Sequence, residues 1–260
     1  MDNQTILYEV EDAVATITLN RQDVMNAINR ELLKALEERI AALQFDSDVR
    51  VVLVTGAGPK AFSAGADLKE RASMSPDEVK SYIHTIGFLY QEIAQLNKPV
   101  IAAINGVAFG GGLELALAAD IRLAADSALV GFPETQLAII PGAGGTQRLP
   151  RIVGRGKAKE LIFTGRRISA AEAREIGLVN QVYPGDQLMA EGKKMAATIA
   201  QAGPIAIAQA KIAIDDGIEA DLRTSLTIES KAYWVCIPTE DRLEGLAAFK
   251  EKRKPVYKGR

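Results

Sequence analysis

The order of hydrophobic and polar positions predicts alternating strands and helices over the first three quarters of the chain. Hydrophobic and polar residues alternate over residues 9–19 on either side of Asp12, which predicts a hairpin or two short strands. Hydrophobic residues recur at helical spacing over residues 26–43, so an amphipathic helix is expected there. The hydrophobic run at residues 49–55 predicts a buried strand. The same patterns predict strands at residues 100–104, 121–124, 128–131 and 179–183, and helices at residues 79–95 and 110–119.

From about Ala143 onward the pattern becomes helical, apart from the strand predicted at residues 179–183. Ser169 and Glu172 have the spacing of a capping box, and Gly177 ends the helix that they begin. Strands interleaved with helices, followed by helices alone, predict an α/β core domain over residues 1–200 and a helical region over residues 201–260. No Ser/Gly-rich linker separates the two, so the helical region should pack on the core or on a neighbouring subunit. The helices are expected at residues 189–202, 205–217, 221–235 and 239–252.

Composition narrows the class of protein and its compartment. The chain has 260 residues, 48% hydrophobic and 25% charged, which is typical of a soluble globular protein. A net charge of -2 gives no basic field for nucleic acid. The single cysteine, Cys236, fits a reducing compartment. The first residues resemble neither a signal peptide nor a transit peptide, and no hydrophobic run is long enough to span a bilayer, so a cytoplasmic location is expected.

Residue counts also exclude several chemistries. With one histidine and one cysteine, the chain cannot build a zinc site from these two residue types, although carboxylate-only magnesium or calcium sites stay open. A Ser-His-Asp triad would have to use His84, which falls in the helix predicted at residues 79–95 and is more typical of a solvent-exposed helix face. An enzyme with this composition would depend on carboxylates and backbone amides.

Three glycine-rich segments carry the candidate chemistry. The first, residues 56–67, matches neither a dinucleotide-binding loop nor a nucleophile elbow, because Ala61 stands where both need glycine. In the second, three glycines open a helix and Glu114 follows Gly111 by one turn, so free amides and a carboxylate share one side. The third places Glu134 before the glycine-rich residues 140–147. Spacing alone leaves open whether these are tight turns with surface glutamates or a paired-carboxylate site.

Three motifs together resemble the crotonase (enoyl-CoA hydratase/isomerase) superfamily. They are residues 61–68 (AFSAGADL), 105–115 (NGVAFGGGLEL) and 140–149 (IPGAGGTQRL), and they occur in the family's order and spacing. The resemblance runs from residue 8 to residue 258. It implies an α/β fold, the crotonase (ClpP-like) spiral of repeated ββα units with a C-terminal helical region. It also implies a homo-oligomer, either a trimer or a hexamer built as a dimer of trimers.

The resemblance assigns roles to particular residues. The amides of Ala66 and Gly111 would form an oxyanion hole, while Glu114 activates water and Glu134 delivers a proton to C2. Gly142 would orient the water through its amide. The coenzyme A part of the substrate would bind along Ala64, Gly65, Ala66, Asp67 and Leu68, with Lys252 reaching a phosphate. No separate cofactor and no metal are expected.

Residues 65–71, 137–141 and 237–246 resemble one branch, the methylglutaconyl-CoA hydratases of leucine breakdown, whose animal member also binds AU-rich RNA through lysines on its first long helix. Here Lys34 lies among Glu31, Glu37 and Glu38, so specific nucleic-acid binding is not expected. Three hypotheses remain: a hydratase for short-chain or branched enoyl-CoA, as in β-oxidation, a crotonase-fold isomerase or hydrolase, and a nucleic-acid-binding protein. The first is preferred.

Overall fold

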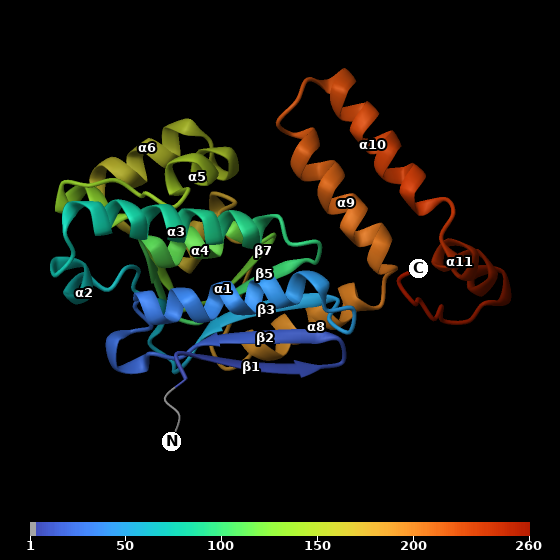
Figure 1. Ribbon diagram of the computed structural model, residues 1–260, viewed down its shortest axis with the longest axis horizontal. Coiled ribbons are helices and arrows are strands. Elements are labelled where there is room, and N and C mark those ends of the chain that lie inside the picture. Colours follow the sequence, from blue (N-terminus) through green and yellow to red (C-terminus); the bar gives the residue numbers. More distant parts are fainter. Residues whose placement is uncertain (1–3) are drawn as a thin grey trace.

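The computed structural model describes residues 4–260, which form two sheets surrounded by helices, with a helical arm on one side (Figure 1). The larger sheet has the order β1 (Ile6–Glu11), β2 (Val14–Leu19), β3 (Val51–Gly56), β5 (Val100–Ile104), β7 (Ile121–Ala125) and β10 (Gln181–Tyr183). The smaller sheet has the order β4 (Ala61–Ser63), β6 (Val107–Phe109), β8 (Leu129–Gly131) and β9 (Arg167–Ser169).

Successive strands of the chain join the two sheets alternately, so both sheets are extended together. β3, β5 and β7 lie side by side in the larger sheet, and the strand that follows each of them, β4, β6 or β8, joins the smaller sheet. A helix then closes each unit: α3 (Pro76–Ala94) after β4, α4 (Gly111–Ala118) after β6, and α5 (Gly145–Val153) after β8. All pairings among these six strands are parallel. This is the predicted spiral of ββα units.

The core lies on both faces of the larger sheet. Every residue of β3 and β5 is buried, as expected for parallel strands covered on two sides. α8 (Leu188–Ala200) packs against β3 and its neighbours. α1 (Arg30–Phe45) lies in front of the sheet (Figure 1) and turns Leu32, Leu36 and Ile40 inward at helical spacing. Asn29 caps this helix by accepting a hydrogen bond from the amide of Leu32.

Most elements agree with the sequence prediction within a few residues, and the differences have local causes. β4, β6, β9 and α2 (Leu68–Ala72) were not predicted, because three to five residues are too few to show a period. Ser169 caps α7 (Ala170–Glu175) as expected, but the Glu172 side chain pairs with Arg166 instead of completing the capping box.

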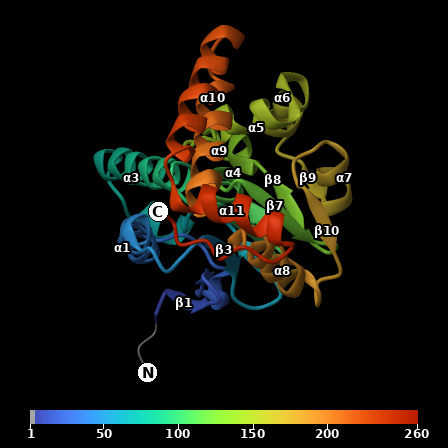
Figure 2. The ribbon, with the colours of Figure 1, turned by 90° about the vertical axis from the view of Figure 1, so that its right-hand side faces the viewer.

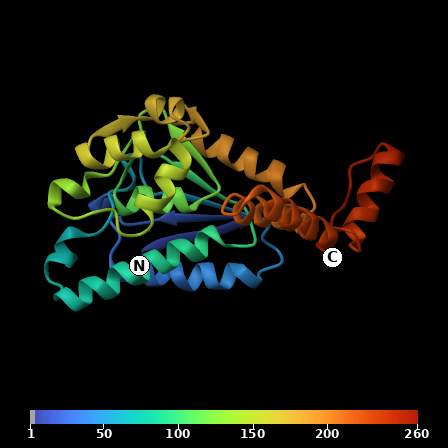
Figure 3. The ribbon, with the colours of Figure 1, turned by 90° about the horizontal axis from the view of Figure 1, so that it is seen from above.

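The C-terminal helices form an arm that extends from the core. It consists of α9 (Pro204–Gly217), α10 (Leu222–Cys236) and α11 (Glu240–Glu251), with α9 packed along α10. Figure 3 shows the arm projecting from one end of the core, and Figure 2 views it end on. The Arg50 guanidinium, on the core, donates to Ala200 O at 2.9 Å and to Tyr257 O at 2.6 Å. Arg50 thus joins the end of α8 to the segment that follows α11. No helix within residues 4–260 is long and apolar enough to cross a membrane.

Gly112 allows α4 to lie directly against β4. A Cβ atom at this position would stand 2.3 Å from Ser63 O, which is main chain and cannot move aside easily. Gly156 is different: it is exposed in α6 (Arg155–Thr164), and a Cβ atom there would meet nothing within 4 Å.

We therefore expect opposite effects from the same substitution at these two glycines. Gly112→Ala should lower the free energy of unfolding by about 1–3 kcal/mol or more through overpacking. Gly156→Ala should raise it by about 0.5–1 kcal/mol, because alanine loses less backbone entropy in a helix. Urea denaturation followed by circular dichroism measures both. Equal effects of the two substitutions would contradict the close approach of α4 to β4.

Candidate active site

One cavity of about 100 Å³ lies where the three glycine-rich segments meet. It brings together most of the residues that the motifs nominated, and adds Arg71, Tyr82, Ile83 and Ile86 to them. Of the nominated residues, Ala64, Gly65, Ala66, Leu68, Gly111, Glu114, Glu134 and Gly142 line it. Asp67 and Lys252 do not.

The amides of Ala66 and Gly111 belong to the same part of this cavity. Asp67 N donates to Ile28 O and Gly65 O accepts from Ile28 N, so in the alternating geometry of a strand Ala66 N faces the other way. Gly111 is the first residue of α4 and has no intrahelical acceptor. Neither amide donates a hydrogen bond within residues 4–260. A Cβ atom on Gly111 would stand 3.7 Å from Ala66 N, so the two residues lie close together beside the cavity.

Glu114 is a buried carboxylate held by backbone amides. Its side chain comes from the first turn of α4 and is only 3% exposed. Oε1 accepts hydrogen bonds from Ala143 N at 2.7 Å and from Gly145 N at 2.8 Å. Burial raises the pKa of Glu114, while these two bonds and the Arg148 guanidinium act in the opposite direction. The amides therefore compensate part of the cost of an ionised carboxylate at this position.

Glu134 faces the same cavity in a different environment. It lies in the short 3-10 helix η2 (Pro133–Leu137), and its Oε2 is buried without a hydrogen-bond partner among residues 4–260. Burial raises the pKa of Glu134 to about 7, and the charge of Glu114 adds to the increase. The residue's own amide and Arg71 oppose it. Burial thus raises the pKa of both carboxyls, but Glu114 also accepts two amide hydrogen bonds that favour its charged form. Two carboxyls in such unequal environments are the usual arrangement of a base and an acid.

Known proteins resemble this chain over nearly its whole length. The model of the enoyl-CoA hydratase/isomerase family matches residues 9–260. The chain belongs to this family. The crystal structure of an enoyl-CoA hydratase from Bacillus anthracis superposes with a TM-score of 0.98 at 53% identity, over 99% of this chain and all of that one. YngF of Bacillus subtilis is 55% identical, over 98% of both chains. Human mitochondrial methylglutaconyl-CoA hydratase is 48% identical, over 97% of this chain and 76% of its own length.

Two of the residues that the motifs predicted for the site do not line the cavity of this protein. The Asp67 side chain caps α2 by accepting from Lys69 N and Glu70 N, and it pairs with Arg21 at 3.0 Å. Lys252 is the residue that ends α11, in the left-handed conformation. Figure 1 shows α11 and α2 at opposite ends of the molecule, so Lys252 is remote from the cavity of its own chain.

The amide donors to Glu114 come from the third glycine-rich segment. They are Ala143 and Gly145, on either side of Gly144, whereas Gly142 lines the cavity without bonding to Glu114. Gly144 has φ of +107°, which glycine adopts most easily. This turn places both amides on one carboxylate oxygen.

Sequence reasoning missed the side chains that hold the loops in place. Arg148 donates to Ala143 O at 3.2 Å and to Gln91 Oε1 at 2.8 Å, joining the third loop to α3. Two tyrosines of α3 act similarly: the Tyr90 hydroxyl donates to Gly111 O, and the Tyr82 hydroxyl donates to Ile28 O beside Ala66. Arg148 was inside a recognised motif, but the partners of all three residues depend on tertiary contacts.

We expect the Glu134 carboxyl to titrate near neutral pH. With its pKa raised to about 7, it is protonated below pH 7 and ionises as the pH rises through that value. An ordinary glutamate, with a pKa of about 4.3, would already be ionised there. Glu114→Gln should lower the pKa by removing a nearby negative charge, and Arg71→Gln should raise it. The infrared carbonyl band of the protonated acid, identified by its loss in Glu134→Gln, reports this titration. A carboxyl ionised throughout the neutral range would contradict the assignment.

Proposed function

We propose that this protein hydrates the 2,3 double bond of a short-chain or branched enoyl-CoA. The proposal rests on one observation. Two carboxyls in different environments, Glu114 and Glu134, line one cavity together with the free amides of Ala66 and Gly111. A hydratase needs a base, an acid and a site for negative charge, and this cavity offers all three.

The Ala66 and Gly111 amides would bind the thioester oxygen. When water adds at C3, the electrons of the double bond move toward that oxygen, which becomes an oxyanion. Backbone donors fixed in advance stabilise such a charge without reorganising during the reaction, and one donor is typically worth about 3–4 kcal/mol. The dipole of α4, which begins at Gly111, favours negative charge at the same place.

The two glutamates would divide the proton transfers. Glu114, whose charged form accepts two amide hydrogen bonds, would take a proton from water as the water oxygen bonds to C3. Glu134, whose neutral form is favoured, gives its proton to C2. Each turnover thus adds one water molecule to the substrate and leaves Glu114 protonated and Glu134 ionised, so proton exchange with solvent restores the pair. Gly142 would orient the water through its amide.

The acyl group would be small. The cavity of about 100 Å³ is well below the 300–1,000 Å³ typical of drug-sized ligands. The 48% identity to human methylglutaconyl-CoA hydratase supports a branched acyl group as the alternative to a straight short chain. Coenzyme A would lie along residues 64–68 as part of the substrate, so the proposal needs no further cofactor.

The exposed apolar surface of the arm supports a trimer or a hexamer. Among its exposed hydrophobic residues are Ile214, Ile218, Leu222, Leu226, Trp234, Leu246 and Phe249. Apolar patches of this kind are typical of protein interfaces. Because Lys252 lies at the far end of its own chain, we propose that it reaches the coenzyme A phosphate in the site of a neighbouring subunit.

Glutamine substitutions test the acid/base pair. Glu114→Gln and Glu134→Gln should each lower kcat for crotonyl-CoA hydration by about two orders of magnitude or more, the usual range for general acid/base help. Glutamine keeps the oxygen that accepts from Ala143 and Gly145, so folding should be preserved in the Glu114 variant. Hydration is followed spectroscopically with crotonyl-, tiglyl- and methylglutaconyl-CoA. Unchanged turnover in both variants would refute the site, and double-bond migration without hydration would favour an isomerase.

Subunit mixing tests the role of Lys252. Lys252→Ala should raise the KM for crotonyl-CoA about tenfold, the typical loss of one charge-assisted contact, but not the KM for a pantetheine thioester without the nucleotide. Co-expression of Lys252→Ala subunits with Glu114→Gln subunits should restore a population of sites with the wild-type KM, because the Glu114→Gln neighbours supply Lys252. No restoration would show that Lys252 acts within its own chain or not at all.

A further inference from the structure

A second cavity lies behind the third glycine-rich loop, between the core and α9 of the arm. It has a volume of about 970 Å³, and we call it the arm cleft; Arg148 of α5 and Lys211 of α9 are among the residues that line it. Gly142 and Ala143 line both the arm cleft and the catalytic cavity. The loop is therefore the wall between the two spaces, and a side chain that holds it from the cleft can act on the catalytic side.

The loop presents two amides to Glu114 because the peptide between them is turned the other way. Ala143 N and Gly145 N donate to Glu114 Oε1. The intervening carbonyl, Ala143 O, instead accepts from the Arg148 guanidinium at 3.2 Å. A Cβ atom on Gly144 would collide with Arg148 Nη1, so the guanidinium lies directly against the turn. Arg148 thus fixes the peptide that lies between the two donors.

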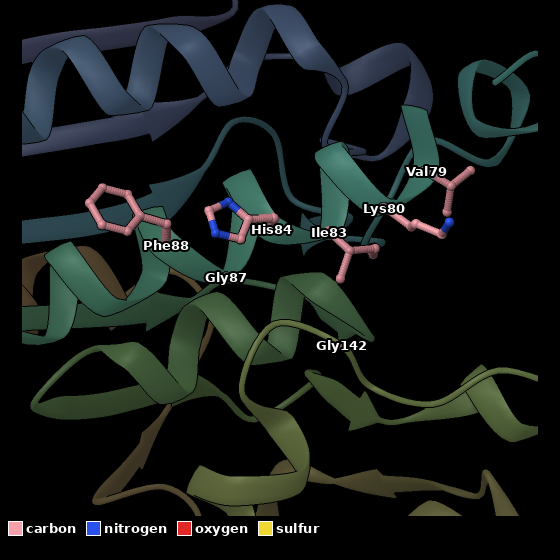
Figure 4. A pocket seen from close by; sticks show the side chains of 7 residues that line it. All are labelled: Val79, Lys80, Ile83, His84, Gly87, Phe88 and Gly142. Carbon is pink, nitrogen blue, oxygen red and sulfur yellow. The ribbon is translucent and has the colours of Figure 1, made fainter. Parts of the chain in front are cut away.

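α3 supplies the other acceptors of Arg148. Its Nη2 donates to Gln91 Oε1 at 2.8 Å and to Tyr90 O at 3.4 Å. Figure 4 shows the loop that carries Gly142 beside α3. All three acceptors are neutral, and the half-buried guanidinium makes no ion pair within residues 4–260. Its positive charge is therefore not cancelled by a carboxylate on the cleft side.

Most other charges around the arm cleft are already paired. Lys211 pairs with Asp120 at 2.9 Å, and Arg151 pairs with Glu219 at 2.7 Å. Burial lowers the pKa of Arg148, and the charge of Glu114 opposes this decrease. The carboxylate that acts on Arg148 is therefore the one on the opposite side of the loop. The remaining charged residues of the cleft are Arg122, Asp215 and Asp216.

We propose that Arg148 is the counter-ion of Glu114, a positioning residue that acts through the loop from the arm cleft and keeps Glu114 able to accept a proton. This inference rests on the proposed function, in which Glu114 is the base. The loop gives the arginine two effects at once: it orients the amides that bind the carboxylate, and it brings a positive charge behind them.

The surroundings of Glu114 leave this task to Arg148. Glu134 faces Glu114 from η2, Tyr90 faces it from α3 and Arg148 faces it from α5. Burial raises the pKa of Glu114, and the two amides and the charge of Arg148 oppose the increase. Arg71 of α2 lines the same cavity, but its charge acts on Glu134. The dipole of α5, which begins at the Gly145 amide, adds to the effect of Arg148.

Two substitutions that remove or cancel the charge test this role. Arg148→Gln keeps a donor for Ala143 O but loses the charge, whereas Gln91→Glu gives Arg148 a carboxylate partner and keeps its hydrogen bonds. Both should move the acidic limb of the pH profile of kcat/KM for crotonyl-CoA to higher pH, because a base that binds its proton more tightly is ionised less readily. For Arg148→Gln the limb should move by about one pH unit, the lower end for a nearby opposite charge. Arg148→Lys keeps the charge and should return the limb toward its wild-type position.

Arg151→Gln and Gln95→Glu are the matched controls. They make the same changes of charge about one turn further along α5 and at the end of α3, and both residues line the arm cleft. Neither should move the limb. If Arg148→Gln does not fold, Gln91→Glu decides. An unmoved limb in the test variants with crotonyl-CoA hydration intact, or an equal movement in the controls, would overturn the inference and leave the proposed function standing.

If the wild-type protein hydrates none of its proposed substrates, the proposed function fails, and spectroscopy then decides the role of Arg148. The infrared carboxylate band of Glu114, identified by its loss in Glu114→Gln, can be titrated without turnover. Its midpoint should rise in Arg148→Gln and Gln91→Glu and stay in place in the two controls. A midpoint that stays in place in all four variants would overturn the inference by itself.

Discussion

The buried carboxylate of Glu114 is the constraint on which the rest of the site depends. An unpaired charge buried at this depth would cost too much free energy. The amides of Ala143 and Gly145 must therefore both lie within hydrogen-bonding distance of Oε1. That requirement fixes the turn at Gly144 and, through it, the position of the third glycine-rich loop against α3. The same helix, α4, carries Gly111 at its start, so the carboxylate and the oxyanion hole are set by one rigid element.

Glu134 differs from Glu114 in its hydrogen bonds. Glu134 has one buried oxygen without a partner among residues 4–260, while Glu114 has two amides on one oxygen. Burial raises the pKa of both carboxyls, and the two amide hydrogen bonds of Glu114 oppose that increase, while the charge of Glu114 adds to the increase at Glu134. Gly110, with φ of +50°, belongs to the same arrangement, because a Cβ atom there would lie 2.8 Å from Glu134 Oε1.

Much of this could be predicted from the sequence, and the failures have physical reasons. α1 was found because its buried residues repeat at helical spacing, and β5 was found because a continuous hydrophobic run marks a strand buried on both faces. Spacing alone made a site with two paired glutamates only plausible. The three family motifs then predicted that both glutamates belong to one site. Asp67 lies inside such a motif, and its side chain caps α2, a role that the motif alone did not indicate.

The bridge from Arg50 to Ala200 and Tyr257 has a consequence for biosynthesis. Arg50 lies in the first quarter of the sequence, and one of its two acceptors follows the last helix of the arm. During translation the core can therefore assemble around its sheets while the arm is still being made, because domains fold from the N-terminal side as the chain emerges. The contact from Arg50 to Tyr257 forms only after residue 257 has left the ribosome, later than the ion pair between Lys211 of α9 and Asp120 of the core.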